Sequence, residues 1–145
     1  MPVLNFLAPH DFRLKEENAV WYIRDEVRKK WLILTPEEWV RQHIIQHLKQ
    51  TFSLSDSNIL VEKKVEINRQ TQRLDVLILK KAQPFLLIEC KAPNVKLTEE
   101  IFEQVARYNS QIKADYLLIT NGLKHIYFHY DKEKNEYSFC EEIEY

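Results

Sequence analysis

The chain has 145 residues, of which 45% are hydrophobic and 30% are charged, and its net charge at pH 7 is −1. This composition is ordinary for a globular domain, and it gives no global electrostatic case for nucleic acid, so a DNA-binding surface would have to be a local patch. The single glycine, Gly122, excludes a glycine-rich phosphate loop and therefore a nucleotide-driven motor in this segment.

Cysteine usage and hydropathy predict the compartment. Two cysteines, Cys90 and Cys140, are typical of a reducing environment rather than of a disulfide framework or a cysteine-based zinc site. The N-terminus lacks the basic start and apolar run of a signal peptide, and no apolar stretch approaches the roughly 20 residues of a membrane span. We therefore expect a cytoplasmic protein without membrane association.

The length predicts a single domain over residues 1–145. Residues 1–34 form its first part, an extended arm followed by a hairpin with strands at Val20–Ile23 and Trp31–Leu34. The basic cluster Arg24–Lys30 between those strands allows two interpretations, a solvated turn or a contact with DNA phosphates. We favour the solvated turn.

A first helix is predicted from Thr35 to about Gln50. Thr35 is its N-cap, and Glu38 completes a capping box with it. Glu37 shares the core-facing side of the helix, so it is our choice over Glu38 for a functional role. The alternative is that both glutamates only complement the helix dipole.

Two strands follow at residues 59–68 and 72–80, joined by a turn at residues 69–71. Glu62 on the first strand is expected to be solvated, although it could reach a metal from there. Arg73 shares the face of Asp75, and a salt bridge explains it more economically than a catalytic role.

The second of these strands and the next apolar run form a hairpin that organises the chain. If that hairpin is symmetrical about Ala82, Asp75 lies opposite Glu89, and Leu79 lies opposite Phe85. Residues directly opposed on antiparallel strands have Cβ atoms only about 5 Å apart, so two carboxylates there repel each other.

Two opposed carboxylates need a compensating charge, and a divalent cation such as Mg²⁺ is one candidate, because it prefers oxygen ligands. Strand alternation puts Lys91 on the same face as Glu89 and turns Cys90 away. The sequence therefore brings Asp75, Glu89 and Lys91 to one end of the hairpin.

A second helix is predicted from Thr98 to Lys113, with Gln104 and Tyr108 one turn apart on a common face. It connects the preceding strand to a strand at Asp115–Thr120 as a crossover, which makes those two strands parallel. A closing hairpin follows in residues 122–145, and its two histidines, His125 and His129, are expected at the surface rather than at a zinc site.

These residues carry a family resemblance. Asp75 followed by Glu89-Cys90-Lys91 resembles the D…(D/E)-x-K motif of the restriction-endonuclease-like nucleases. Together with Ala92-Pro93-Asn94, Gln104-x-x-x-Tyr108 and the segment Pro36 to Gln42, it is similar to the N-terminal nuclease domain of type I restriction enzyme R subunits.

The resemblance implies an α/β fold with a restriction-endonuclease-like core at residues 35–121, a mixed β-sheet flanked by helices. The order is helix, three antiparallel strands, helix, strand, with β-hairpin additions at both ends. It also implies a Mg²⁺- or Mn²⁺-dependent DNA endonuclease. Its metal ligands would be Asp75, Glu89, Glu37 and the Cys90 carbonyl, with Lys91 in the reaction.

In that family Gln104 and Tyr108 would contact the site or the DNA backbone. The implied partners are DNA and the translocase and specificity subunits of a restriction system. The alternative function is a non-catalytic DNA- or protein-binding module on a nuclease fold, and RNA is a less favoured substrate.

Overall fold

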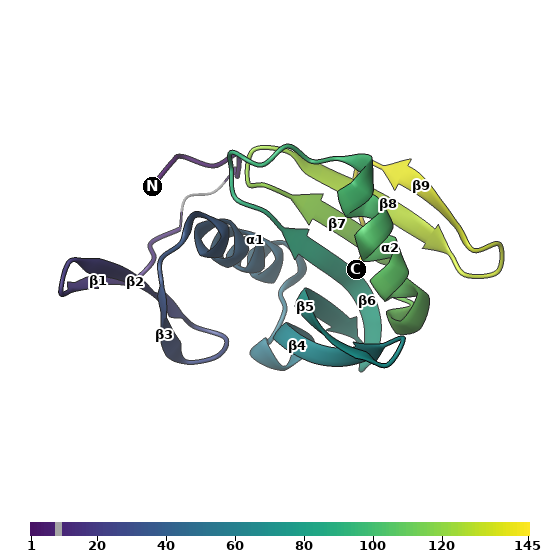
Figure 1. Cartoon of the computed structure of the whole chain (residues 1–145), viewed down its shortest axis with the longest axis horizontal. Coiled ribbons are helices and arrows are strands. Elements are labelled where there is room, and N and C mark those ends of the chain that lie inside the picture. The colour runs from purple at the N-terminus through teal and green to yellow at the C-terminus, as the bar shows by residue number, and fades with distance from the viewer. Residues whose placement is uncertain (8–9) are drawn as a thin grey trace.

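The computed structural model describes residues 1–7 and 10–145, and it divides their strands between two sheets (Figure 1). The smaller sheet is antiparallel, in the order β1-β2-β3: β1 Leu14–Glu17, β2 Val20–Asp25 and β3 Lys30–Ile33. The larger sheet has six strands in the order β4-β5-β6-β7-β8-β9: β4 Ile59–Ile67, β5 Gln70–Lys80, β6 Gln83–Cys90, β7 Tyr116–Thr120, β8 His125–Asp131 and β9 Glu136–Cys140.

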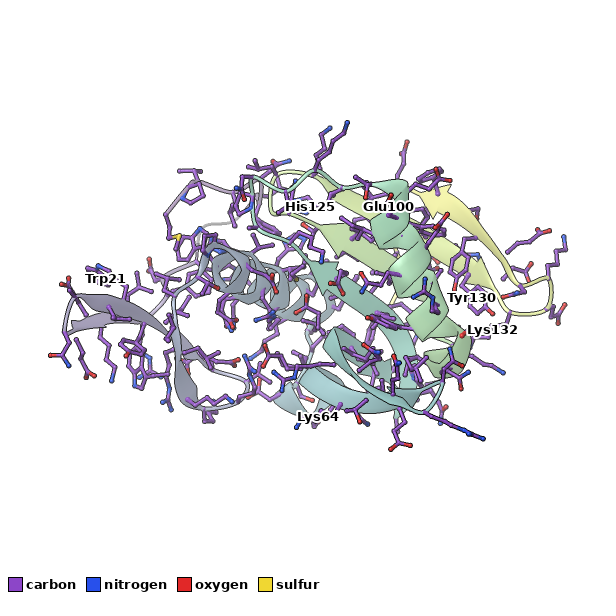
Figure 2. The ribbon with its side chains drawn as sticks, viewed as in Figure 1. Trp21, Lys64, Glu100, His125, Tyr130 and Lys132 are labelled. Atoms are coloured by element: carbon purple, nitrogen blue, oxygen red, sulfur yellow. The ribbon has the colours of Figure 1, made fainter. Side chains whose placement is uncertain are left out.

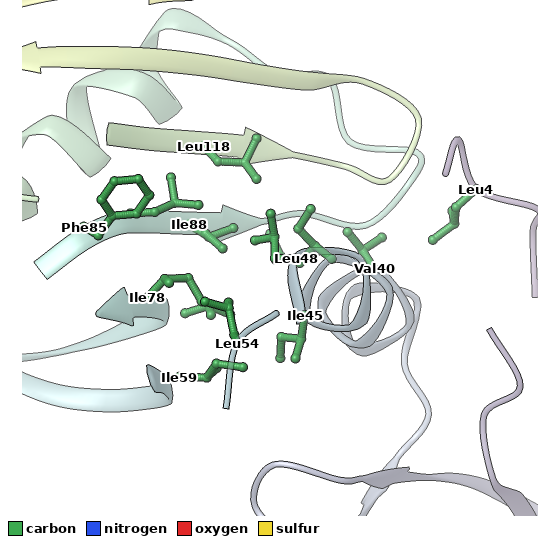
Figure 3. Packing of buried hydrophobic residues seen from close by; sticks show 14 residues of the cluster. Leu4, Val40, Ile45, Leu48, Leu54, Ile59, Ile78, Phe85, Ile88 and Leu118 are labelled. Carbon is green, nitrogen blue, oxygen red and sulfur yellow. The ribbon is translucent and has the colours of Figure 1, made fainter. Parts of the chain in front are cut away.

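Two α-helices, α1 (Pro36–Phe52) and α2 (Glu99–Ile112), pack on opposite faces of the larger sheet, and a 3₁₀ turn at Asp56–Asn58 leads into β4. Successive strand residues point to opposite faces, and here Ile88 belongs to the core under α1 while Leu87 belongs to the core under α2. Figure 3 shows the first of these cores, where α1 faces the sheet. In the described part of the chain, no helix has the length and apolar character needed to cross a membrane.

The mixed topology follows from the crossover through α2. β6 and β7 are parallel, with Leu87 opposite Leu117, and the other neighbouring pairs of the larger sheet are antiparallel. The predicted α/β class, the parallel pair and the closing hairpin are therefore confirmed. The hairpin belongs to the main sheet, because β8 pairs with β7.

The predicted N-terminal hairpin is confirmed as the β2–β3 pair, and a further strand, β1, extends it to a three-stranded sheet. Asn18 and Ala19 have φ values of 52° and 63°, which form a tight turn and fold β1 back onto β2. The arm before it is docked at Leu4, which is buried in the core under α1. Residues 8 and 9 of the predicted arm lie outside the described residues.

The central hairpin has a tighter turn than predicted. Lys81 and Ala82 occupy the left-handed region, with φ of 51° and 62°, and form a two-residue connection. A register shift after Ile78 places Leu79 opposite Pro84, so the expected pairing of Leu79 with Phe85 is wrong. The turn between β4 and β5 also differs from the prediction. It lies at Asn68-Arg69, one residue before its predicted start at Arg69, because both residues adopt the left-handed conformation.

We expect Gly122→Ala to lower the free energy of unfolding by about 1–3 kcal/mol. Gly122 has φ of +85°, and a Cβ there would lie 2.9 Å from a Leu4 methyl and 3.0 Å from a Val40 methyl. Urea denaturation measures the change. Leu123→Ala at the exposed neighbouring position is the control, and equal stability of the two variants would contradict the steric argument.

Candidate active site

A polar pocket of about 160 Å³ lies where the start of α1 meets β4, β5 and β6. All six residues that line it are charged: Glu37, Arg41, Glu62, Arg73, Asp75 and Glu89. Three of the residues predicted from the sequence, Asp75, Glu89 and Glu37, therefore line one pocket. Arg41 was not predicted.

Asp75 and Glu89 come together through the pairing of β5 with β6. The paired register ends with Val76 opposite Ile88, and Asp75 and Glu89 occupy the next positions on each strand. Leu77 lies opposite Leu87 in the same register, as a hairpin symmetrical about Ala82 requires.

Asp75 also marks a break in the alternation of β5. Leu74 and Leu77 both belong to the core under α2, although residues three apart on a regular strand point to opposite faces. The break lies across from Glu62 of β4, whose φ of 52° is left-handed. This irregularity gives Asp75 access to α1.

Arg41 of α1 is the partner that Asp75 meets there. Its Nε lies 2.5 Å from Asp75 Oδ1, and the Cys90 backbone N–H donates to Asp75 Oδ2 at 2.7 Å. Arg41 also donates to Glu37 at 2.9 Å and to Glu38 at 2.6 Å. Since the side chains of Arg41 and Asp75 are only 7% and 6% exposed, this is a buried ion pair.

Glu38 does not complete the predicted capping box. Its backbone N–H donates to Thr35 Oγ1 at 3.0 Å, so the N-cap itself is confirmed. Its carboxylate instead accepts from Arg41 and from Gln42. A hydrogen bond from a guanidinium is stronger than one from a neutral amide, which explains the preference.

Burial and neighbouring negative charge raise the pKa values of two carboxyls of the pocket, Glu89 and Glu37. Burial, followed by the charge of Asp75, raises the pKa of Glu89 to about 7, and Lys91 opposes this rise. Burial and Asp75 also raise the pKa of Glu37. Lys91 Nζ lies 3.3 Å from Glu89 Oε1, so the predicted common face of these two residues is confirmed, while Cys90 is buried in the core under α1.

Two residues that the sequence analysis left in solvent reach this charge cluster. Arg28, from the turn between β2 and β3, donates to Glu62 at 3.1 Å and to Asp25 at 2.5 Å. The side chain of Arg28 is 14% exposed, so the interpretation of its cluster as a solvated turn is wrong at this position. Glu62 also lies 3.4 Å from Arg41.

Of the residues at this site that were not predicted, only Arg41 could have been found from its spacing in the sequence. Arg41 follows Glu37 and Glu38 by four and three residues, a spacing at which charges on a helix meet. Arg28 and Glu62 are 34 residues apart, and no pattern in the sequence joins them. Arg73 lies 3.9 Å from Glu62, in agreement with its predicted role as a salt-bridge partner.

Gln104 and Tyr108 do not line the pocket. Gln104 donates to the Tyr108 hydroxyl at 3.0 Å, and that hydroxyl donates to Gln72 of β5 at 3.4 Å. Among the described residues, no hydrogen bond joins either side chain to Asp75, Glu89 or Lys91. Their role in the site stays a prediction.

A comparison with protein families identifies the family of the chain that forms this pocket. The family model described as Type I restriction enzyme R protein N terminus (HSDR_N) matches residues 36–143. The chain belongs to this family. The matched residues 36–143 include every residue that lines the pocket, whereas the β1–β3 sheet precedes the matched residues. No curated protein matches the chain.

Arg41→Ala should lower the free energy of unfolding of this R-protein domain by about 3–5 kcal/mol, because it leaves buried carboxylates without their cation. Urea denaturation at pH 7 measures the loss. Arg73→Ala is the matched control, since the Arg73 side chain is 57% exposed and its ion pair should contribute less than about 1 kcal/mol. Similar losses in both variants would contradict the buried network.

Glu89→Gln should stabilise the metal-free protein in a pH-dependent way. The folded-state pKa of about 7 exceeds the ordinary value of 4.5, so ionising Glu89 opposes folding increasingly from pH 4.5 to 7, and fully above pH 7. We expect a gain of about 3 kcal/mol at pH 8 and almost none at pH 4. Denaturation in chelator at both pH values tests this, and equal effects would refute it.

Proposed function

We propose that this domain is a Mg²⁺-dependent DNA endonuclease with a restriction-endonuclease-like core, and that it hydrolyses phosphodiester bonds at the charged pocket. One observation carries the proposal. Asp75 and Glu89 line a single pocket, with the Lys91 ammonium 3.3 Å from Glu89, in a chain of the type I restriction R-protein family.

The donor set suits a hard divalent cation. Mg²⁺ commonly takes one or two protein carboxylates and completes its shell with water and substrate phosphate. Asp75 and Glu89 would supply those carboxylates, with Glu37 and the Cys90 carbonyl as further oxygens. Within the described residues, no group of three His, Cys, Asp or Glu side chains is arranged to hold a metal, so the arrangement supports Asp75 and Glu89 as a carboxylate pair better than it supports Glu37 as a third ligand.

Each residue then has a distinct task. A bound divalent cation would polarise the scissile phosphate and lower the pKa of a water molecule. Lys91 would orient that water and stabilise the negative charge that develops on the phosphate. Arg41 fixes the orientation of Asp75, while Gln104 and Tyr108 would support the β5 strand at Gln72.

A second candidate function is a DNA- or protein-binding module without catalysis. The observation that favours it is the ion pair between Arg41 and Asp75, which gives this carboxylate a cation from the protein itself. In either case the proposed partners are DNA and the other subunits of a cytoplasmic restriction system.

The test combines metal binding with DNA cleavage. Purified protein should bind Mn²⁺ weakly in calorimetry and nick supercoiled DNA only when Mg²⁺ or Mn²⁺ is present. Asp75→Asn should weaken metal binding and abolish cleavage, because an amide is a poorer ligand than a carboxylate. Lys91→Ala should retain metal binding and lose turnover, since its proposed role is in the reaction.

Lys96→Ala, an exposed lysine in the same loop, is the matched control and should cleave normally. Cleavage that survives both Asp75→Asn and Lys91→Ala would refute the site. DNA binding without any metal binding would establish the non-catalytic module instead.

A further inference from the structure

The small β1–β3 sheet presents aromatic and cationic side chains on one face. Directly opposed residues share a face, and Lys15 is opposite Tyr22 while Arg24 is opposite Trp31. Tyr22 and Arg24 are two residues apart on β2, so all four side chains lie together. We call Lys15, Tyr22, Arg24 and Trp31 the aromatic–cation face.

The two cations lie against the aromatic rings. Lys15 Nζ is 4.6 Å from the centroid of the Trp31 ring and 5.8 Å from that of Tyr22. The guanidinium carbon of Arg24 is 5.9 Å from the Trp31 centroid. Rings with cations at their faces combine the two elements with which proteins bind single-stranded nucleic acid, a stacking surface and a positive charge for the backbone.

The contacts of Lys15 are of a kind that a ligand can replace. Its ion pair with Glu17, at 3.2 Å, is solvent-exposed, with side-chain exposures of 36% and 60%. Exposed ion pairs and cation–π contacts are weak, and lysine has a long flexible stem. The ammonium can therefore move from the ring to a phosphate while a base takes its place over Trp31.

The other face of the small sheet is occupied by the protein. Ile23 and Asp25 point there, and both are completely buried. Trp21 also belongs to that face by alternation, but at its outer part, where it is 49% exposed (Figure 2). On the aromatic–cation face, by contrast, all four side chains are partly exposed, and Trp21 on the other face provides an internal reference.

Charge and position both favour a nucleic acid as the ligand. Residues 13–31 contain six basic and four acidic residues in a chain with a net charge of −1. The same sheet is joined to the charged pocket, because Arg28 bridges Asp25 and Glu62. The sheet lies outside the residues that match the R-protein family model.

We propose that the aromatic–cation face binds single-stranded DNA, with bases stacked on Trp31 and Tyr22 and with Lys15 and Arg24 on the phosphates. The choice of DNA rests on the proposed nuclease function, but the binding itself requires no metal. A strand held on this face would lie on the sheet that borders the pocket.

The experiment measures the affinity of the full chain for a fluorescent oligothymidylate, by anisotropy in chelator, where no cleavage can occur. Trp31→Ala and Tyr22→Ala should each weaken binding about tenfold, and Trp31→Phe should restore most of the affinity by keeping a stacking ring. Lys15→Ala should reduce the dependence of affinity on salt, because one phosphate contact is lost.

Trp21→Ala is the matched control, since it removes an exposed tryptophan from the opposite face, and it should bind like the wild type. Wild-type affinity of Trp31→Ala, an equal loss in Trp21→Ala, or no binding of the oligonucleotide by the wild type would each overturn the proposal. A protein that binds in chelator but never cleaves would leave this inference standing while the proposed nuclease function fails.

Discussion

The arrangement of the candidate site depends on one buried guanidinium. Arg41 contacts Asp75 on β5 and Glu38 one turn earlier on α1, and it lies 3.4 Å from Glu62 on β4. A buried cation needs such partners, because the loss of its hydration is otherwise uncompensated. The same contacts tie the start of α1 to the middle of the β4–β5 pair, where Glu62 and Asp75 lie.

The charge network continues from this centre into the small sheet. Arg28 bridges Asp25 of β2 to Glu62, and Gln42 of α1 donates to Asp25 at 3.2 Å. Asp25 is fully buried, so its hydrogen bonds are made inside the protein rather than with water. The added sheet is thus joined to the site by specific polar contacts, which restrict its orientation more than a nonspecific apolar contact does.

Local patterns in the sequence were sufficient for the helices and for the central register. Thr35 and Thr98 each accept the hydrogen bond expected of an N-cap. A hairpin taken as symmetrical about Ala82 places Leu77 opposite Leu87, as observed, and Asp75 and Glu89 follow from that pairing. These features depend on neighbours within a few residues or across one tight turn.

The features that could not be predicted depend on distant residues or on the left-handed backbone. Glu62 has a left-handed φ without being glycine, so its break in the strand pattern has no sequence signal. Arg28 reaches the site from a turn 34 residues away from its partner. From the sequence, a divalent cation was one candidate for the charge that compensates Asp75 and Glu89, whereas Arg41 supplies a cation from within the protein.

The balance of charge leaves the network with an excess of carboxylates despite the presence of Arg41. Six carboxylates belong to the network, and four cations face them: Asp25, Glu37, Glu38, Glu62, Asp75 and Glu89 against Arg28, Arg41, Arg73 and Lys91. This excess of negative charge adds to burial, the larger cause, in raising the pKa values of Glu37 and Glu89 beside Asp75.

A proton on Glu89 therefore relieves the same repulsion that a divalent cation would relieve. Removal of Arg41 would enlarge the negative excess and favour protonation further, so it would not simply free Asp75 as a better ligand. On the proposed function, the guanidinium and a metal ion would have complementary roles. The first holds Asp75 in place, and the second would neutralise the charge that remains.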